Sequence, residues 1–392
     1  MELFNCHQFF RNNFKYHTEQ EIRQQPELWL QTVAIIEKQQ NKIKNFFDKI
    51  IKQEKQLRII FTGAGSSAFV GKTVVPYLNK KLPYRFEAIA TTDIVTNPTE
   101  YLQQEIPTLL ISSARSGNSP ESIATVNIAE QMVDNLYQIA LTCNPEGELA
   151  RKMDRRENAL MILMPEQAHD QGFAMTGSFT TMVLSALAIF NLENLDQLSK
   201  KITLIAERGT DIFTEELSIV HNIAGENYER AVYLGSSTLK GIAEEAALKM
   251  LELTRGKVAT NYESSLGFRH GPKSVINDRT LIWFFFSEDP YVRQYEVDLL
   301  REIANGAKVK SIVAVTNSYQ EDVKQLADYY IGLSSAETGG EDDVFLAFNY
   351  VLLAQLNAFY KSIYLGINPD NPSPSGNVNR VVKGVEIYQY RK

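Results

Sequence analysis

The chain has 392 residues, a length that suggests two to three domains, each able to bury a core. Its content of 44% hydrophobic and 22% charged residues is that of a folded globular protein and excludes a largely disordered chain. The 40 basic and 47 acidic residues give a net charge of −7, which argues against nucleic-acid binding but is compatible with a phosphate pocket built from backbone N–H groups.

The sequence carries no signature of a metal site, a disulfide framework or a membrane segment. Its two cysteines, Cys6 and Cys143, lie in neither a CxxC motif nor a Cys/His cluster. The first residues lack a basic start followed by an apolar stretch, so they do not resemble a secretory signal. The most apolar runs, at 182–190 and 281–286, fall well short of the ~20 residues that span a bilayer. We therefore expect a cytoplasmic protein without metal or cofactor.

A helical segment followed by buried strands is predicted for the first half of the chain. Apolar residues recur at helical spacing between about 18 and 53, and Pro26 suits the first turn of a helix there. Short apolar runs then alternate with helix-length amphipathic stretches, which predicts a parallel sheet covered by helices on both faces. The predicted strands are 58–65, 108–113, 137–144 and 159–164.

A second set of strands repeats the spacing of the first. Gly63 and Gly235 are 172 residues apart, and so are Thr108 and Thr280. Internal duplication explains these offsets, and a coincidence of common strand patterns is the alternative. The second strands are predicted at 230–237, 280–287, 309–317 and 328–335. We expect a helical segment at 1–53, a first α/β domain at 54–215 and a second at 216–392.

Two loops of the first domain are candidate phosphate binders. The turn at Gly63–Ser67 follows a strand, but its glycines do not complete the dinucleotide-binding pattern, which disfavours a nucleotide ligand. The loop after the strand at 108–113 is more telling, because Ser119 and Pro120 suit the N-cap and first position of a helix. Free N–H groups at that helix end, with Arg115 and Ser116 beside them, suit a phosphate monoester. The alternative is an ordinary helix cap with serines facing solvent.

A third loop, at 172–181, precedes the apolar helix that contains 182–190. Its small hydroxyl residues, Thr176 among them, either line the same pocket or pack the helix into the core.

Candidate proton-transfer groups lie in the second domain. A helix is predicted at 238–254, and Glu245, Lys249 and Glu252 share one of its faces. A solvated stripe with one ion pair is the alternative, but alanine, leucine and methionine flank this face. Such surroundings would raise the pKa of a carboxylate toward the range of a general base. Farther along, His270 lies in a loop bounded by glycine and proline, where a catalytic role and a structural one are both open.

These segments together resemble the sugar-isomerase (SIS) domain family over nearly the whole chain beyond residue 50. The resemblance rests on SARSGNSPES at 113–122, EEAALKMLEL at 244–253 and FRHGP at 268–272, and EIRQQPELW at 21–29 adds to it. Within the family, the chain is most similar to the group of galactosamine-6-phosphate deaminases and tagatose-6-phosphate isomerases. It also resembles the isomerase half of glutamine–fructose-6-phosphate aminotransferase.

The resemblance implies two tandem SIS domains and a role for each matching residue. Glu252 corresponds to the carboxylate that moves a proton between C2 and C1 of the sugar, His270 to the ring-opening histidine, and Lys383 to a lysine that reaches the open-chain sugar. The implied substrate-binding residues are Gly65, Ser66, Ser67, Arg115, Ser116, Ser119 and Thr176.

The sequence departs from the aminotransferase at two positions of the loop at 113–122 and in its domain content. Arg115 stands where the aminotransferase has a neutral amide, and Ala114 replaces a serine. The glutamine-hydrolysing domain, with its N-terminal cysteine, has no counterpart, and Cys6 is not placed to replace that cysteine. We therefore do not expect glutamine to supply ammonia as a substrate.

The resemblance further implies an enzyme that converts galactosamine 6-phosphate into tagatose 6-phosphate and ammonia without a cofactor. Pure tagatose-6-phosphate isomerisation and a non-catalytic sensor of sugar phosphates are the alternatives. The expected ligand is a hexose or hexosamine 6-phosphate. Family members combine subunits at the active site, which implies a homo-oligomer, a dimer or larger.

Overall fold

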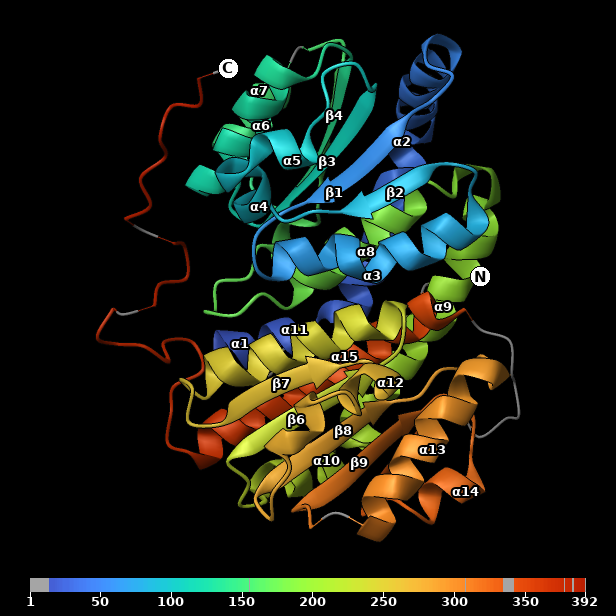
Figure 1. Ribbon diagram of the computed structural model, residues 1–392, viewed down its shortest axis with the longest axis vertical. Helices are drawn as coiled ribbons and strands as arrows, with labels where there is room; N and C mark the ends of the chain where they lie inside the picture. Colours follow the sequence, from blue (N-terminus) through green and yellow to red (C-terminus); the bar gives the residue numbers. More distant parts are fainter. Residues whose placement is uncertain are drawn as a thin grey trace.

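The computed structural model describes residues 14–154, 156–306, 308–333, 342–376, 378–382 and 384–391. Within this part of the chain, two five-stranded parallel sheets lie one above the other, with helices between and around them (Figure 1). Sheet A has the order β2-β1-β3-β4-β5, and sheet B has the order β10-β9-β8-β6-β7. The fold class predicted for the chain, an α/β protein of two tandem domains, is confirmed. The strands of sheet A are β1 (Arg58–Thr62), β2 (Arg85–Ala88), β3 (Thr108–Ala114), β4 (Leu136–Thr142) and β5 (Ala159–Leu163), and those of sheet B are β6 (Arg230–Gly235), β7 (Ala259–Glu263), β8 (Thr280–Phe285), β9 (Ser311–Thr316) and β10 (Tyr329–Gly332).

The two sheets are built on one plan. Read from its β7 edge, sheet B has the order β7-β6-β8-β9-β10, which repeats sheet A strand for strand. Corresponding strands begin 170 to 175 residues apart along the chain. The repeated order, together with the repeated spacing, confirms the duplication inferred from the sequence.

Helices cover both faces of each sheet. In the space between the sheets lie α3 (Ser66–Lys81), α8 (Gly177–Ala188), α11 (Thr238–Leu253) and α15 (Asp343–Tyr364) (Figure 1). The outer face of sheet A is covered by α4 (Thr91–Thr96), α5 (Pro98–Tyr101), α6 (Pro120–Met132) and α7 (Glu148–Met153), and that of sheet B by α12 (Ser265–Phe268), α13 (Pro290–Gly306) and α14 (Glu321–Lys324). The remaining helices are α1 (His17–Arg23), α2 (Gln25–Gln53), α9 (Leu195–Glu215) and α10 (Leu217–Gly225).

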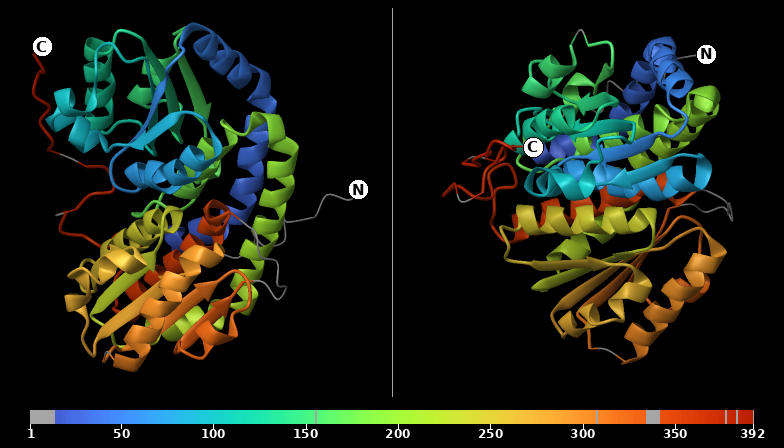
Figure 2. Two further views of the ribbon diagram at one scale, coloured as in Figure 1. Left: turned by 45° about the vertical axis from the view of Figure 1, so that its right-hand side comes forward. Right: turned by 45° about the horizontal axis from the view of Figure 1, so that its top comes forward.

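The N-terminal helices bind the two sheets into one body. Figure 2 shows α2 and α9 side by side along the flank of both halves. Trp29 of α2 is fully buried, donates a hydrogen bond to Thr180 of α8 at 2.9 Å and packs edge-on against Phe348 of α15, with ring centroids 5.4 Å apart. One hydrophobic cluster therefore runs through both halves instead of two separate cores.

The predicted helix at 18–53 is in fact two helices. α1 ends at Arg23, Gln24 separates the helices, and α2 begins at Gln25 with Pro26 in its first turn. A proline lacks the N–H for an intrahelical hydrogen bond, and its ring clashes with the carbonyl four residues earlier. The first helix therefore ends before Pro26, and a new helix begins there, in agreement with the preference of proline for a first helical turn.

Strands β2 and β7 were not predicted from the sequence. β2 is an edge strand with one buried residue, and β7 is an edge strand without any. Neither strand therefore carries the continuous apolar run that identified the central strands. The helices expected at 182–190 and 238–254 are confirmed as α8, which ends at Ala188, and α11, which ends at Leu253. No described helix is long and apolar enough to cross a membrane.

We predict that the close packing of α3 on α11 depends on Gly241. A Cβ atom at Gly241 would lie 2.8 Å from Thr73 Oγ1 and 2.9 Å from its backbone nitrogen. Gly241→Ala should therefore push the helices apart and lower the free energy of unfolding by about 1–3 kcal/mol, as overpacked cores do. Urea unfolding measures this, with Gly306→Ala as a control because nothing lies near its Cβ position. Equal stability of the two variants would contradict the prediction.

Candidate active site

The candidate site lies where the carboxyl edge of sheet A faces the C-terminal half of α11. The two helices α3 and α11 run antiparallel, since the turn before α3 approaches Leu248 while Thr73, farther along α3, approaches Gly241. The Cβ position of Gly65 is 4.0 Å from the Leu248 side chain. The charge of Arg115, after β3, acts on Lys249 of α11. The fold thus brings the predicted phosphate loops of the first domain to the predicted catalytic helix of the second.

The turn before α3 requires glycine for two different reasons. A Cβ at Gly63 would lie 2.5 Å from the backbone of Ser67, and Gly65 has φ of 57°, in the left-handed region that favours glycine. Ser66 and Ser67 follow and are buried, with Ser66 beside Glu245 and the Ser67 hydroxyl 3.8 Å from the sulfur of Met175.

The loop after β3 has the form of an anion cradle. Ser119 is the N-cap of α6 and Pro120 its first residue, as predicted, but the Ser119 hydroxyl makes no capping hydrogen bond and is left available. The carbonyl of Ser116 accepts a hydrogen bond from Asn144 at 2.9 Å, and that of Gly117 accepts one from the Leu149 N–H. The loop is therefore fixed through its carbonyls, and its N–H groups lie at the N-terminus of a 13-residue helix, where an anion is stabilised.

Arg115 braces the surrounding segments. It is buried, and its guanidinium donates to the carbonyls of Phe173 and Ala174, both at 3.3 Å, and of Arg380 at 2.8 Å. These hydrogen bonds tie the loop before α8 and the C-terminal tail to the phosphate loop. The predicted contact of Arg115 with the phosphate stays a prediction, since its donors serve these three carbonyls.

Thr176 has a structural partner. Asp170 accepts hydrogen bonds from the N–H groups of Thr176, Gly177 and Ser178 at the start of α8, and from the Thr176 hydroxyl at 2.8 Å. Thr176 is fully buried, so of its two predicted roles the geometry favours packing of the helix terminus.

Glu245, Lys249 and Glu252 form a buried charged row on α11. The Lys249 ammonium, 1% exposed, contacts the Glu252 carboxylate and lies 3.6 Å from Glu245. Glu245 is fully buried, and its carboxyl group lies beside both the Lys249 ammonium and the Ser66 hydroxyl. Burial raises the pKa of Glu245 to about 8, although the Lys249 charge offsets part of this effect. The solvated stripe considered for this face is therefore wrong, because only Glu252 retains some exposure, 25%.

Lys249 itself remains a cation. Burial acts to lower the pKa of Lys249, but the negative charges of Glu245 and Glu252 outweigh burial and raise it. The expected upward shift of a carboxyl pKa on this helix face thus occurs at Glu245, which sequence reasoning noted only as a neighbour of Glu252.

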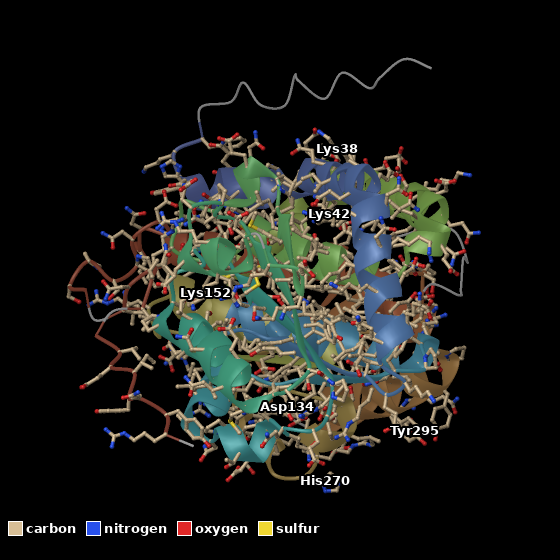
Figure 3. All side chains as sticks on the ribbon, turned by 90° about the horizontal axis from the view of Figure 1, so that it is seen from above. Lys38, Lys42, Asp134, Lys152, His270 and Tyr295 are labelled. Carbon is tan, nitrogen blue, oxygen red and sulfur yellow. The ribbon has the colours of Figure 1, made fainter. Side chains whose placement is uncertain are left out.

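His270 lies far from Glu252 within one chain. α11 crosses from the carboxyl end of β6 to the amino end of β7, so Glu252 lies at the amino edge of sheet B. His270 follows the carboxyl end of β7 and is exposed, and Figure 3 shows it at the rim of the molecule with its ring pointing outward. Arg269 and Lys273 on either side both pair with Glu302 of α13, which fixes the loop.

The C-terminal tail reaches the site although its described part contains no helix or strand. It runs from the lower half up along the first domain (Figure 1). Arg380 donates to the carbonyl of Asp170 while its own carbonyl accepts from Arg115. The predicted catalytic Lys383 lies outside the described residues.

The corresponding edge of sheet B holds a cavity of about 900 Å³ with different chemistry. Its lining includes Glu288, Asp289 and Asp343. Asp289 accepts the N–H of Tyr291 at 2.9 Å and Asp343 that of Glu288 at 2.9 Å, so carboxylates of the protein occupy N–H groups at this edge. Lys80 and Arg293 also line the cavity, which therefore carries charges of both signs.

Sequence reasoning missed Glu21, which links α1 to the site. Its carboxylate accepts hydrogen bonds from the N–H groups of Gln171 and Gly172, in the loop braced by Arg115. Burial raises the pKa of Glu21 to about 8, and the charge of Asp170 adds to the effect. The stretch 21–29 was noted for its resemblance, but only the fold shows that Glu21 contacts this loop.

Comparison with known proteins agrees with the two-domain fold. The SIS domain matches residues 50–191 and again residues 226–363. The chain belongs to the SIS-domain family. It is 42% identical over 375 residues to D-galactosamine-6-phosphate deaminase AgaS of Escherichia coli, covering 95% of this chain and 96% of that protein. The crystal structure of tagatose-6-phosphate ketose/aldose isomerase from Escherichia coli has a TM-score of 0.89 at 40% identity and covers 96% of this chain and 98% of its own. A structure from Clostridium novyi NT has a TM-score of 0.93 at 50% identity, with 95% of each chain covered.

The buried carboxyls make stability depend on pH. Glu21 and Glu245 have pKa values of about 8 in the folded chain against an ordinary 4.5, so between these values the native state binds more protons than the unfolded state. The stabilisation is complete below pH 4.5 and is lost as pH rises through 8. We expect the free energy of unfolding to fall by about 2 kcal/mol between pH 7 and pH 8.

Urea unfolding at the two pH values measures this change, and Glu245→Gln should halve it. A free energy of unfolding that is constant over this interval would show that the two carboxyls are already ionised at pH 7.

Proposed function

We propose that the chain is a sugar-phosphate deaminase/isomerase that converts galactosamine 6-phosphate into tagatose 6-phosphate and ammonia. The observation that carries this proposal is the meeting of the anion cradle of sheet A with the charged face of α11. Arg115 acts electrostatically on Lys249, and Ser66 lies beside Glu245, so a substrate held at the cradle by its phosphate is close to the Lys249–Glu252 pair. The likeness to AgaS proteins supports the choice of substrate.

The phosphate anchors the inert end of the sugar on the Ser116–Ser119 loop, where N–H groups and the α6 N-terminus meet it. Glu252 then removes the proton from C2 and returns one to C1. Its carboxylate is partly exposed at the end of α11, and Lys249 stabilises its negative charge. Positioned acid–base transfer of this kind contributes about 10²–10⁴-fold to the rate.

The fate of the intermediate depends on the group at C2. With an amine there, the proton transfer from C2 to C1 passes through an enolamine and gives a ketimine. Water adds to the C=N bond, and ammonia leaves as the ketone forms. With a hydroxyl at C2, the same transfer passes through an enediol and interconverts an aldose and a ketose phosphate.

Ring opening by His270 requires a second copy of the chain under this proposal. His270 and Glu252 lie at opposite edges of sheet B within one chain, and His270 is exposed. A second copy, docked so that its His270 reaches the cleft beside Glu252, completes the site. In a symmetric dimer such an exchange is reciprocal, which gives two complete sites.

Tagatose-6-phosphate ketose/aldose isomerisation is the second candidate, and it is favoured by the likeness to the Escherichia coli isomerase structure. It uses the same residues in the same order. The two functions differ only in whether ammonia is a product.

We predict release of ammonia from galactosamine 6-phosphate, with formation of a ketose 6-phosphate. Glu252→Gln should lower kcat by about 10²–10⁴-fold and change KM little, because it removes the proton carrier and leaves the phosphate contacts. A coupled assay for ammonia measures both, with glucosamine 6-phosphate and tagatose 6-phosphate as comparison substrates. Isomerisation of tagatose 6-phosphate without any ammonia from either amino sugar would select the second candidate.

Mixing two inactive variants tests the shared site. Glu252→Gln and His270→Ala should each be inactive alone, but a mixed dimer contains one site with Glu252 from one chain and His270 from the other. Random reassociation should therefore restore about a quarter of wild-type activity in a symmetric dimer. Mass spectrometry should first show that the mixture contains mixed dimers. If such a mixture has no activity, His270 does not contribute to the partner's site.

A further inference from the structure

The cavity of about 900 Å³ at the carboxyl edge of sheet B takes no part in the proposed reaction. Its walls are formed by the last turns of α3 and by the first residues of α11, α13 and α15. In α/β proteins, ligands bind at this edge, outside the carboxyl ends of the strands. The volume is also within the range of small-molecule sites. Position and size therefore suit a ligand, and the lining residues decide its chemistry.

The turn from β6 into α11 repeats the turn at the candidate active site. A Cβ at Gly235 would lie 2.5 Å from a carbonyl oxygen of the helix that follows, as would a Cβ at Gly63. Ser237 has φ of 54°, close to the 57° of Gly65, although this left-handed conformation is strained for a serine. A hydroxyl group of the second half thus lines the cavity where the first half has a glycine without a side chain.

Two hydroxyl groups at this turn have no hydrogen-bond partner within the described part of the chain. Ser237 and Thr238 both line the cavity, and Ser237 makes no capping hydrogen bond to α11. Thr238 is only 3% exposed, and its hydroxyl makes no hydrogen bond to a described residue. A polar group withdrawn from water in this way is stabilised by a ligand that hydrogen-bonds to it.

The cavity has more carboxylates than cations. Arg293 lies 3.0 Å from Glu288, and Lys80 lies 3.8 Å from Asp342. These two ion pairs leave two of the four carboxylates, Asp289 and Asp343, without a basic partner among the described residues. The resulting excess of negative charge favours a positively charged ligand group. The acidic lining residues are Glu288, Asp289, Asp342 and Asp343, and the basic ones are Lys80 and Arg293.

Helix capping accounts for only part of the Asp289 carboxylate. The N–H groups of Tyr291 and Val292, at the start of α13, both donate to its Oδ1, at 2.9 and 3.4 Å. Its Oδ2 has no partner within the described part of the chain. Burial raises the pKa of Asp343, and the negative charges of Asp289 and Glu288 add to this effect, so the three carboxyl groups lie close together. A cation placed between them relieves their mutual repulsion.

We propose that this cavity is a second ligand site, which binds a hydroxylated primary amine in its cationic form, such as an amino sugar without a phosphate. The ammonium lies between Asp289 and Asp343, and the hydroxyl groups of the ligand bind Ser237 and Thr238. A phosphate is not required, because Glu288 already holds the guanidinium of Arg293. The second site is independent of the reaction proposed at sheet A, because none of its lining residues belongs to the candidate active site.

Isothermal titration calorimetry with galactosamine, N-acetylgalactosamine and galactose tests this site. Galactosamine should bind to the wild type, and the other two sugars, which lack a cationic amine, should bind at least about tenfold more weakly. Asp289→Asn should weaken the binding of galactosamine by about tenfold or more, since it removes the charge while asparagine still caps α13. Thr238→Val should weaken it by about 2–10-fold, because it removes one hydroxyl at nearly constant shape.

Asp298→Asn is the matched control. Asp298 is an exposed aspartate on the same helix, but it does not line the cavity. This variant should bind galactosamine as the wild type does. Asp289→Asn should also keep the wild-type kcat and KM for galactosamine 6-phosphate, since the phosphate loop and α11 are unchanged.

The proposal is overturned if galactosamine does not bind, if it binds to the wild type and Asp289→Asn with equal affinity, or if galactose binds as tightly. A crystal soaked with galactosamine locates the sugar: density in this cavity supports the proposal, and density only at sheet A contradicts it. Turnover measured on the same preparation separates the two sites. Normal turnover without binding of galactosamine rejects the second site alone, whereas binding that depends on Asp289 in a chain without turnover rejects the proposed reaction alone.

Discussion

The close antiparallel contact of α3 with α11 is the constraint on which the site depends. Gly241 allows the two helix backbones to approach at Thr73, and the same contact brings the turn at Gly65 to within reach of Leu248. The predicted phosphate loops belong to one sheet and the charged helix to the other, so neither half holds the candidate site alone. The continuous core through α2, α8 and α15 then fixes the sheets relative to each other, which holds these groups at constant separation.

Desolvation gives the charged groups of α11 their properties. In water, a glutamate next to a lysine would be ionised and the pair would contribute little. Here burial raises the pKa of Glu245, while the negative charges of Glu245 and Glu252 raise the pKa of Lys249 against the effect of burial. The ion pair of Lys249 with Glu252 lies at the end of this row that is nearest to solvent.

The duplicated halves differ in the groups that meet the equivalent loop N–H groups. In sheet A, the N–H of Asn118 donates to the Ser116 hydroxyl, and Ser119 makes no capping hydrogen bond at the N-terminus of α6. In sheet B, Asp289 and Asp343 occupy the corresponding donors.

The sequence by itself determined the parallel sheets, the duplication, the helix start at Pro120 and the helix α11, because each is encoded in local periodicity, turn residues or a short motif. It did not determine the edge strands β2 and β7, which lack a buried face on which a hydrophobic pattern would appear. Tertiary structure alone decided that Glu245 and Lys249 are fully buried, that Thr176 is held by Asp170, and that His270 points away from Glu252 in one chain. These facts depend on which elements pack together and how much water they exclude, and helical spacing carries no information about either.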